Sequence, residues 1–161
     1  MIREITQDIV NQTIQGAKTT ARKRLHRNFH SSYDEPIQRL LNAIEPYSYI
    51  QPHKHENPDK LEIFMVIRGR FLVLIFDETG RITHHSLLDA SNGNYGIEIH
   101  PGTYHLITSL VKGSVAYEVK DGPYDETADK SWAPWAPPEG SKETREYLDK
   151  CFAEVGIYPA E

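Results

Sequence analysis

Two histidines and a glutamate lie close together in one stretch of this 161-residue chain. His53 and His55 are two positions apart, so in an extended segment both imidazoles point to the same face. Glu62 follows a turn signal at 57–59 and lies in the apolar run 61–67, which predicts a strand. A buried carboxylate needs a partner, because burying an isolated charge costs several kcal/mol. A divalent cation that also binds neutral imidazole would supply that partner.

A third histidine, His105, follows the turn dipeptide Pro101-Gly102 at the start of another predicted strand. It can therefore point into the same interior as the first pair. Three imidazoles and one carboxylate suit a divalent first-row metal, and Fe, Mn, Co, Ni and Zn are all compatible with such a set. We therefore predict one divalent metal ion, bound by the following residues: His53, His55, Glu62 and His105.

The remaining histidines call for other interpretations. His84 and His85 are adjacent, so they point to opposite faces of a strand, and we expect both on the surface. His100 precedes the turn proline and is interpreted as structural. His30 lies in a polar loop and is a candidate for the mouth of a ligand pocket.

The composition restricts the class of protein. Hydrophobic residues make up 39% and charged residues 25% of the chain, as in ordinary soluble proteins. The net charge of −5 gives no overall positive field, so we expect neither nucleic acid nor a membrane as a partner. Cys151 is the only cysteine, which excludes an intrachain disulfide and a thiolate-rich zinc site. With no export signal or membrane-spanning run, the expected location is the cytoplasm.

Strand signals dominate the middle of the chain. The segment 37–44 is interpreted as a strand, with a short helix as the alternative. Further strands are predicted at 47–51, 61–67, 71–76, 82–88, 95–99, 104–110 and 115–119. Glycine-bearing links of hairpin length join several of them. Closely spaced strands without intervening helices favour an antiparallel all-β sandwich, jelly roll or barrel.

The two ends differ from this middle part. Isoleucines at near-helical spacing predict an amphipathic helix before Gly16, and the basic run 18–27 is interpreted as a solvated helix end and linker, with a phosphate-binding patch as the alternative. The segment 132–138 contains two tryptophans and three prolines, which predicts an extended strap packed on the barrel, with an aromatic ligand platform as the alternative. A C-terminal helix is expected from Ser141 to Val155.

These elements predict a single domain over 1–161, at the length where a fold buries roughly 70% of its unfolded surface. We divide it into an N-terminal helix and basic linker (1–27), a barrel core (28–123), and a strap with the C-terminal helix (124–161).

The metal-ligand pattern resembles the two motifs of the cupin family. The first motif is matched by His53, His55, Glu62 and Gly69, and the second by Pro101, Gly102 and His105. The sequence departs from the motifs in three places: Tyr47 replaces a glycine, Pro101 and Gly102 are adjacent, and Ser109 stands where asparagine is common. None of these departures affects a ligand. The resemblance implies an antiparallel cupin β-barrel, or jelly roll, with flanking N-terminal and C-terminal helices.

Further segments resemble the WbuC-type cupin fold metalloproteins over roughly residues 21 to 127. They are Arg27-Asn-Phe-His30, Gln38-Arg-Leu-Leu41, Pro52-His-Lys-His55, Tyr104-His105 and Glu118-Val-Lys-Asp-Gly-Pro123. This resemblance implies a metal-bearing barrel associated with genes for cell-surface polysaccharide synthesis. Cupin resemblance also implies a homodimer formed through sheet edges.

The predicted function is that of a metal-dependent cupin that binds or acts on a small sugar-like or carboxylate-bearing molecule, as an isomerase or epimerase, through Lewis-acid chemistry. Candidate residues for orienting this molecule are His30, Arg39, Tyr47, Tyr49, Tyr95 and Tyr104. The sequence identifies no general base. The alternatives are a non-catalytic ligand-binding or regulatory cupin, and a cupin whose metal is structural only.

Overall fold

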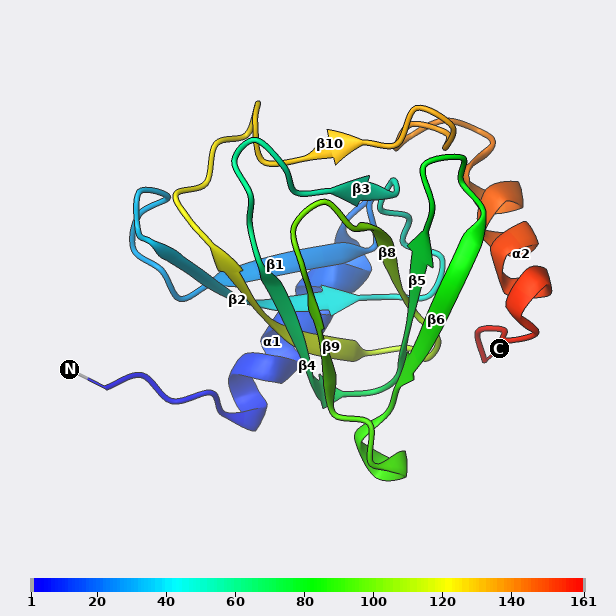
Figure 1. Cartoon of the computed structure of the whole chain (residues 1–161). Helices are drawn as coiled ribbons and strands as arrows, with labels where there is room; N and C mark the ends of the chain where they lie inside the picture. Colours follow the sequence, from blue (N-terminus) through cyan, green and yellow to red (C-terminus); the bar gives the residue numbers. More distant parts are fainter. Residues whose placement is uncertain (1, 161) are drawn as a thin grey trace.

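The computed structural model describes residues 2–160 and contains two five-stranded antiparallel sheets (Figure 1). The first sheet has, in spatial order, β1 (Arg24–Asn28), β2 (Ile37–Ile44), β9 (Ser114–Asp121), β4 (Glu62–Arg68) and β7 (Gly96–Ile99). The second has β10 (Ser131–Trp132), β3 (His53–Lys54), β8 (Tyr104–Ser109), β5 (Phe71–Phe76) and β6 (Ile82–Leu88). The two sheets face each other, and the predicted antiparallel all-β architecture with flanking helices is confirmed.

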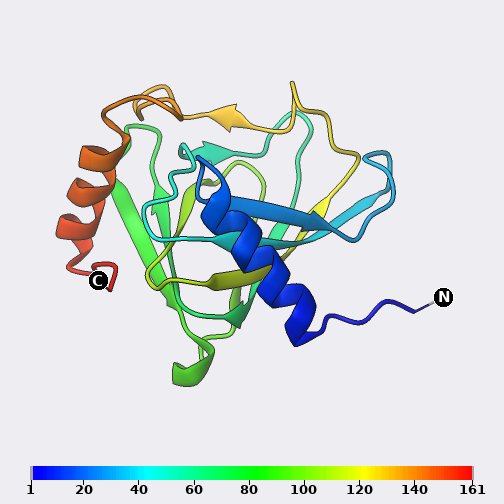
Figure 2. The same ribbon diagram turned by 180° about the vertical axis from the view of Figure 1, so that it is seen from behind.

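A helix covers the outer face of each sheet. Helix α1 (Gln7–Thr19) lies across the first sheet, as Figure 2 shows, and buries Val10, Ile14 and Ala17 against it. Helix α2 (Thr144–Val155) packs on the second sheet through Leu148 and Phe152. A short 3₁₀ turn, η1 (Ala90–Asn92), lies in the β6–β7 connection. No described helix combines the length and apolar character needed to span a membrane.

Strand β5 is apolar at every position and does not alternate between apolar and polar residues. Phe71 and Val73 point between the sheets, whereas Leu72 and Leu74 point outward to the cluster that includes α2. Both faces of this strand are therefore buried, which requires apolar residues at every position. The link from β4 to β5 needs Gly69, whose φ of +80° favours glycine and where a Cβ would lie 2.2 Å from Ser114 Oγ.

Most of the predicted elements are confirmed within one or two residues. The segment 37–44 is a strand, as interpreted, and not a short helix. The predicted strand at 47–51 is wrong: Tyr47 has a φ of +64°, and Ser48 N–H donates to the Glu45 carbonyl in a turn. The N-terminal helix continues past Gly16 to Thr19.

The basic run differs most from its interpretation as a solvated linker. Residues 24–28 form β1 and pair with β2. The Arg24 side chain is buried, because its guanidinium binds the Glu139 carboxylate at 2.6 Å and the Tyr49 carbonyl at 2.9 Å. Sequence alone did not indicate this partner, which lies far along the chain.

Candidate metal centre and its cavity

The four predicted ligands come together between the two sheets. His53 on β3 pairs in register with His105 on β8, which places their ring centroids 4.5 Å apart. His55 follows β3 directly, and Glu62 begins β4 in the facing sheet. All four side chains are buried, and one potential ligand atom of each lies within 4.8 Å of the others. The fold thus forms the cluster that the spacing predicted.

Backbone carbonyls fix the orientation of the three imidazoles. The Nδ1 atoms of His53, His55 and His105 lie 2.9, 2.5 and 2.9 Å from the carbonyls of Gln51, Asp129 and Thr103. A carbonyl can only accept, so each Nδ1 carries a proton and donates it. In a neutral ring this leaves the Nε2 lone pair free, the usual arrangement of a metal-binding histidine.

The contacts at the centre of the cluster suit a bound cation. Glu62 Oε2 lies 3.0 Å from His105 Nε2 and 3.4 Å from His55 Nε2. When the rings are neutral these atoms are all acceptors, so their approach is unfavourable unless a positive charge lies among them. His55 Nε2 is also buried without a hydrogen-bond partner among the described residues. The donor set therefore fits a divalent metal ion.

The electrostatics of the cluster favour the ligating forms. Burial, together with the nearby His105, lowers the pKa of His53 well below its usual value and so favours a neutral ring. Burial acts to raise the pKa of Glu62, but hydrogen bonds that the Nε2 atoms of His105 and His55 donate when these rings are protonated, together with the charge of Lys120, outweigh it. The pKa of this carboxyl is held well below its usual range. A carboxylate and neutral imidazoles are the forms that bind metal.

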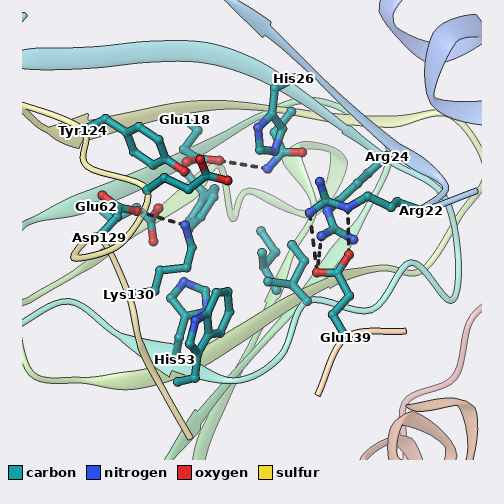
Figure 3. A pocket seen from close by; sticks show the side chains of 16 residues that line it. Arg22, Arg24, His26, His53, Glu62, Glu118, Tyr124, Asp129, Lys130 and Glu139 are labelled. Atoms are coloured by element: carbon teal, nitrogen blue, oxygen red, sulfur yellow. Dashed lines mark hydrogen bonds and ion pairs between the residues drawn. The ribbon is translucent and has the colours of Figure 1, made fainter. Parts of the chain in front are cut away.

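A cavity of about 380 Å³ opens beside the cluster (Figure 3). His53 and Glu62 form part of its wall, next to apolar residues of the core. Its polar and aromatic lining is formed by Arg22, Arg24, His26, Asn42, Glu118, Tyr124, Glu126, Asp129, Lys130, Trp132 and Glu139. A ligand in the cavity would therefore reach the cluster directly.

Asp129 organises one side of this site. Its backbone carbonyl orients His55, while its carboxylate lies 2.6 Å from Lys120 Nζ, 2.9 Å from Lys130 Nζ and 3.2 Å from Lys60 Nζ. Lys60 and Lys120 are buried, so the shared carboxylate offsets part of the cost of desolvating their charges. Sequence reasoning did not identify Asp129, because its role depends on tertiary contacts with residues in other elements.

Two further titratable groups line the cavity. Glu118 on β9 accepts a hydrogen bond from Asn42 Nδ2 at 2.8 Å, and burial and the nearby Glu62 raise its pKa to about 7. His26 on β1 also lines the cavity, and more than a third of its surface is accessible. Burial and Arg24 lower the pKa of His26. The signal for Glu118 was present in the sequence, since it is the one charged residue of the predicted strand 115–119.

The six residues predicted to orient a ligand lie elsewhere, and none is among the described residues that line this cavity. Tyr104 is next to His105 on β8, so it points to the opposite face and packs against Trp135. The Tyr49 hydroxyl donates to the Pro137 carbonyl. Tyr47 packs against Phe152.

The other three also have separate environments. Tyr95 is exposed before β7. His30 Nδ1 lies 3.0 Å from the backbone nitrogen of Arg39, which donates to it, and the Arg39 guanidinium forms an ion pair with Glu35. His84 and His85 are exposed, as predicted, and His100 is exposed beside Glu98.

The two tryptophans of the strap have different environments. Trp135 packs against Phe76 at a centroid distance of 5.1 Å, which confirms the packing interpretation for this indole. Trp132 instead lines the cavity, with its ring centroid 5.4 Å from that of His53 and nearly half of its surface exposed. The alternative of an aromatic platform therefore stays open for Trp132.

Comparison with solved structures identifies the class of fold. The protein BH2720 from Bacillus halodurans is 19% identical, with a TM-score of 0.52 over 81% of this chain and 89% of that one. L-ribose isomerase from Cellulomonas parahominis, solved with L-ribose, is 14% identical, with a TM-score of 0.53 over 73% and 72% of the two chains. The capsular polysaccharide assembling protein CapF from Staphylococcus aureus is 18% identical, with a TM-score of 0.53 over 68% of this chain.

The chain spans only 31% of the length of CapF. At these identities the likenesses show the fold, and the chain is a cupin-fold protein with a buried three-histidine, one-glutamate cluster. Residues 5–88 match the family model described as "Domain of unknown function (DUF6016)", and the chain belongs to this family. No curated protein sequence matches the chain.

Proposed function

We propose that this chain is a metal-dependent cupin of the WbuC type that binds a small sugar-like or carboxylate-bearing molecule and isomerises or epimerises it. We place this activity in cell-surface polysaccharide synthesis. The observation that carries the proposal is the position of the cluster, because His53 and Glu62 form part of the wall of a cavity. Structural metal sites are usually closed by protein ligands, whereas catalytic sites keep a position for water or substrate.

The metal supplies one part of the proposed chemistry. A bound divalent ion would act as a Lewis acid that polarises a carbonyl or hydroxyl oxygen of the ligand. The four protein ligands would hold the ion, and the backbone carbonyls that orient the histidines would keep the set rigid. Glu62 has the role of a ligand, because its carboxylate already faces two imidazole nitrogens.

Glu118 is the residue best placed to transfer protons. Isomerisation or epimerisation removes a proton from one carbon and returns a proton to the substrate, so it needs a group that exchanges protons near neutral pH. Glu118 lines the cavity, is held by Asn42, and in the metal-free protein has a pKa raised to about 7 by burial and by Glu62. These three properties support its assignment as the acid–base residue of the proposed reaction.

Two resemblances support the choice of ligand. The sequence resembles WbuC-type proteins, which are associated with polysaccharide genes. Among proteins of the same fold, one is an L-ribose isomerase solved with L-ribose and another is named for capsular polysaccharide assembly. The fold therefore serves sugar chemistry in other proteins, while the assignment to this chain depends on its own cavity.

Thermal unfolding with a panel of sugars and sugar acids tests the proposal. Metal-loaded protein should be stabilised by at least one member, by about 2.7 kcal/mol at a hundred times its Kd, and metal-stripped protein should not respond. The wild-type protein should convert that ligand, whereas Glu118→Gln should bind it without turnover. Glu98→Gln, at an exposed position, is the matched control and should retain activity.

Each departure from this result contradicts a definite part of the proposal. Equal stabilisation of loaded and stripped protein would contradict the role of the metal in ligand binding. Binding without turnover by the wild-type protein would replace the enzyme with the non-catalytic binding or regulatory cupin. Normal turnover by Glu118→Gln would remove this residue from the reaction.

A further inference from the structure

The cavity contains two neighbouring groups that the metal chemistry does not use, Trp132 and Lys130. We infer that they form a subsite for a monosaccharide with an anionic group, in which the sugar ring stacks on the indole and the anion binds the ammonium. This inference rests on the proposed function and specifies its ligand. Both side chains line the cavity, and Lys130 Nζ lies 5.9 Å from the centroid of the Trp132 ring.

The position of Trp132 is set by strand pairing. Trp132 on β10 pairs in register with His53 on β3, which places the indole beside this ligand of the cluster. With 48% of its surface exposed, the indole is accessible at the cavity, with Lys130 Nζ 5.9 Å from its ring centroid. The apolar C–H face of a pyranose ring fits such a surface, while its hydroxyls stay free for polar partners.

Trp135, three residues later, shows what a packing tryptophan looks like in the same strap. Its ring lies against Phe76 and Tyr104, and a Cβ added at Gly80 would lie 2.7 Å from it. Packing thus explains one indole of the strap and leaves the exposed face of Trp132 available for a ligand.

Lys130 provides a cation with spare hydrogen-bonding capacity. Its Nζ donates to Asp129 Oδ2 at 2.9 Å, yet the same carboxylate also serves Lys120 and Lys60. The Asp129 carboxylate therefore contacts three ammonium groups. Lys130 is the one of the three that lines the cavity, and an ammonium has three N–H donors, of which Asp129 accepts one.

The opposite wall is less suited to an anion. Figure 3 shows Arg22 and Arg24 together at Glu139, across the cavity from Lys130. Arg24 is committed to Glu139 at 2.6 Å and to the Tyr49 carbonyl at 2.9 Å, and Arg22 binds the other oxygen of Glu139 at 2.7 Å. The anionic group of a ligand should therefore bind at Lys130.

The size of the cavity limits the ligand. Its volume of about 380 Å³ lies at the lower end of the usual range for small-molecule sites, about 300–1,000 Å³. This volume suits a single sugar ring with its anionic group and excludes a nucleotide sugar as a fully enclosed ligand. The substrate class is therefore an anionic monosaccharide, such as a sugar acid.

Calorimetric titration of metal-loaded protein with D-glucuronate, D-glucose 6-phosphate and D-glucose tests this inference. The variants are Lys130→Met and Trp132→Leu, and the matched control is Lys150→Met on the exposed side of α2. Metal content is measured for each protein. The wild type and the control should bind at least one of the two anionic sugars about tenfold more tightly than glucose.

Lys130→Met should reduce that preference to about twofold or less while retaining its metal and its affinity for glucose. Trp132→Leu should weaken all three sugars about tenfold, since the ring loses its platform. Comparison of D-glucose 6-phosphate with D-glucuronate shows which anion Lys130 binds more tightly. Tighter binding of either sugar than of D-glucose supports the subsite. Sugar binding that neither substitution alters, or a wild-type preference for glucose, would overturn the subsite and leave the proposed function intact. Metal-loaded wild-type protein that binds no sugar at all would overturn both.

Discussion

The space between the two sheets has two halves built from the same strands but with opposite chemistry. On β4, Phe64 lies in the apolar half, whereas Glu62 lies in the polar half. On β8 the corresponding pair is Ile107 and His105. On β9, Ala116 belongs to the apolar half, and Glu118, two residues later, lines the cavity.

This difference shows how the fold separates stability from chemistry. The apolar half stabilises the sandwich by removing side chains from water. The polar half costs free energy, because buried charges are unfavourable unless each has a partner. Here the partners are present: Asp129 with its three lysines, Glu118 with Asn42, and Arg24 with Glu139. Substitutions in the two halves should therefore have different effects.

The largest effect on stability is expected in the apolar half. Phe71 is fully buried there, so Phe71→Ala should lower the free energy of unfolding by about 3–5 kcal/mol through lost burial and a new cavity. Urea denaturation measures this loss, and the folded protein should keep its metal. The control, Met65→Ala at a position that is 43% exposed, should cost less than about 1 kcal/mol. Similar losses for the two variants would contradict the tight packing of Phe71 in this half.

A smaller loss is expected at the cavity mouth. Glu139→Gln leaves the buried Arg24 without its carboxylate and should cost about 2–3 kcal/mol at neutral pH. Hydrogen bonds and charges from Arg24 and Arg22 outweigh burial and lower the pKa of Glu139 below 4.5. Its stabilisation is therefore fully present above pH 4.5 and is lost as pH falls through the folded-state pKa. The difference between wild type and variant should shrink below pH 4.5, and a constant difference down to pH 2 would contradict this ion pair.

Glu118, in the polar half, should change the free energy of unfolding with pH in the opposite direction to Glu139. Burial and Glu62 raise the pKa of Glu118 to about 7 from an ordinary value of 4.5. A carboxyl whose pKa is raised in the folded state contributes its full stabilisation below pH 4.5. This stabilisation is lost as pH rises to the folded-state pKa of about 7. In metal-stripped protein, Glu118→Gln should therefore gain about 3 kcal/mol relative to wild type over that interval. Denaturation curves at both pH values measure the gain, and parallel pH profiles would show that Glu118 is not perturbed.

The sequence predicted most strands and the four candidate metal ligands, because both depend on local patterns. Strand alternation placed His53 and His55 on one face, and turn dipeptides delimited the strands around His105. These signals are local, so they can be recognised without knowledge of tertiary contacts. The strand at 47–51 was wrong because a left-handed residue at Tyr47 turns the chain, which its composition does not reveal.

The rest of the cavity could not be predicted in the same way. Arg24, Asp129 and Glu139 have their roles through contacts between distant parts of the chain. Tyr104 was predicted to orient a ligand, but it is adjacent to His105 in a strand and therefore faces the opposite side. Glu118 was recognisable in principle, because a carboxylate at an inward position of an apolar strand needs the same explanation as Glu62.

Metal analysis of protein purified without chelators tests the central claim most directly. Elemental mass spectrometry should find about one divalent ion per chain in the wild type and in the control His84→Ala/His85→Ala, whose histidines are exposed. His53→Ala/His55→Ala removes two of the three imidazoles and should lose the ion while circular dichroism shows the fold retained. Undiminished metal content in the folded His53→Ala/His55→Ala protein, or loss of metal in the control alone, would contradict the site.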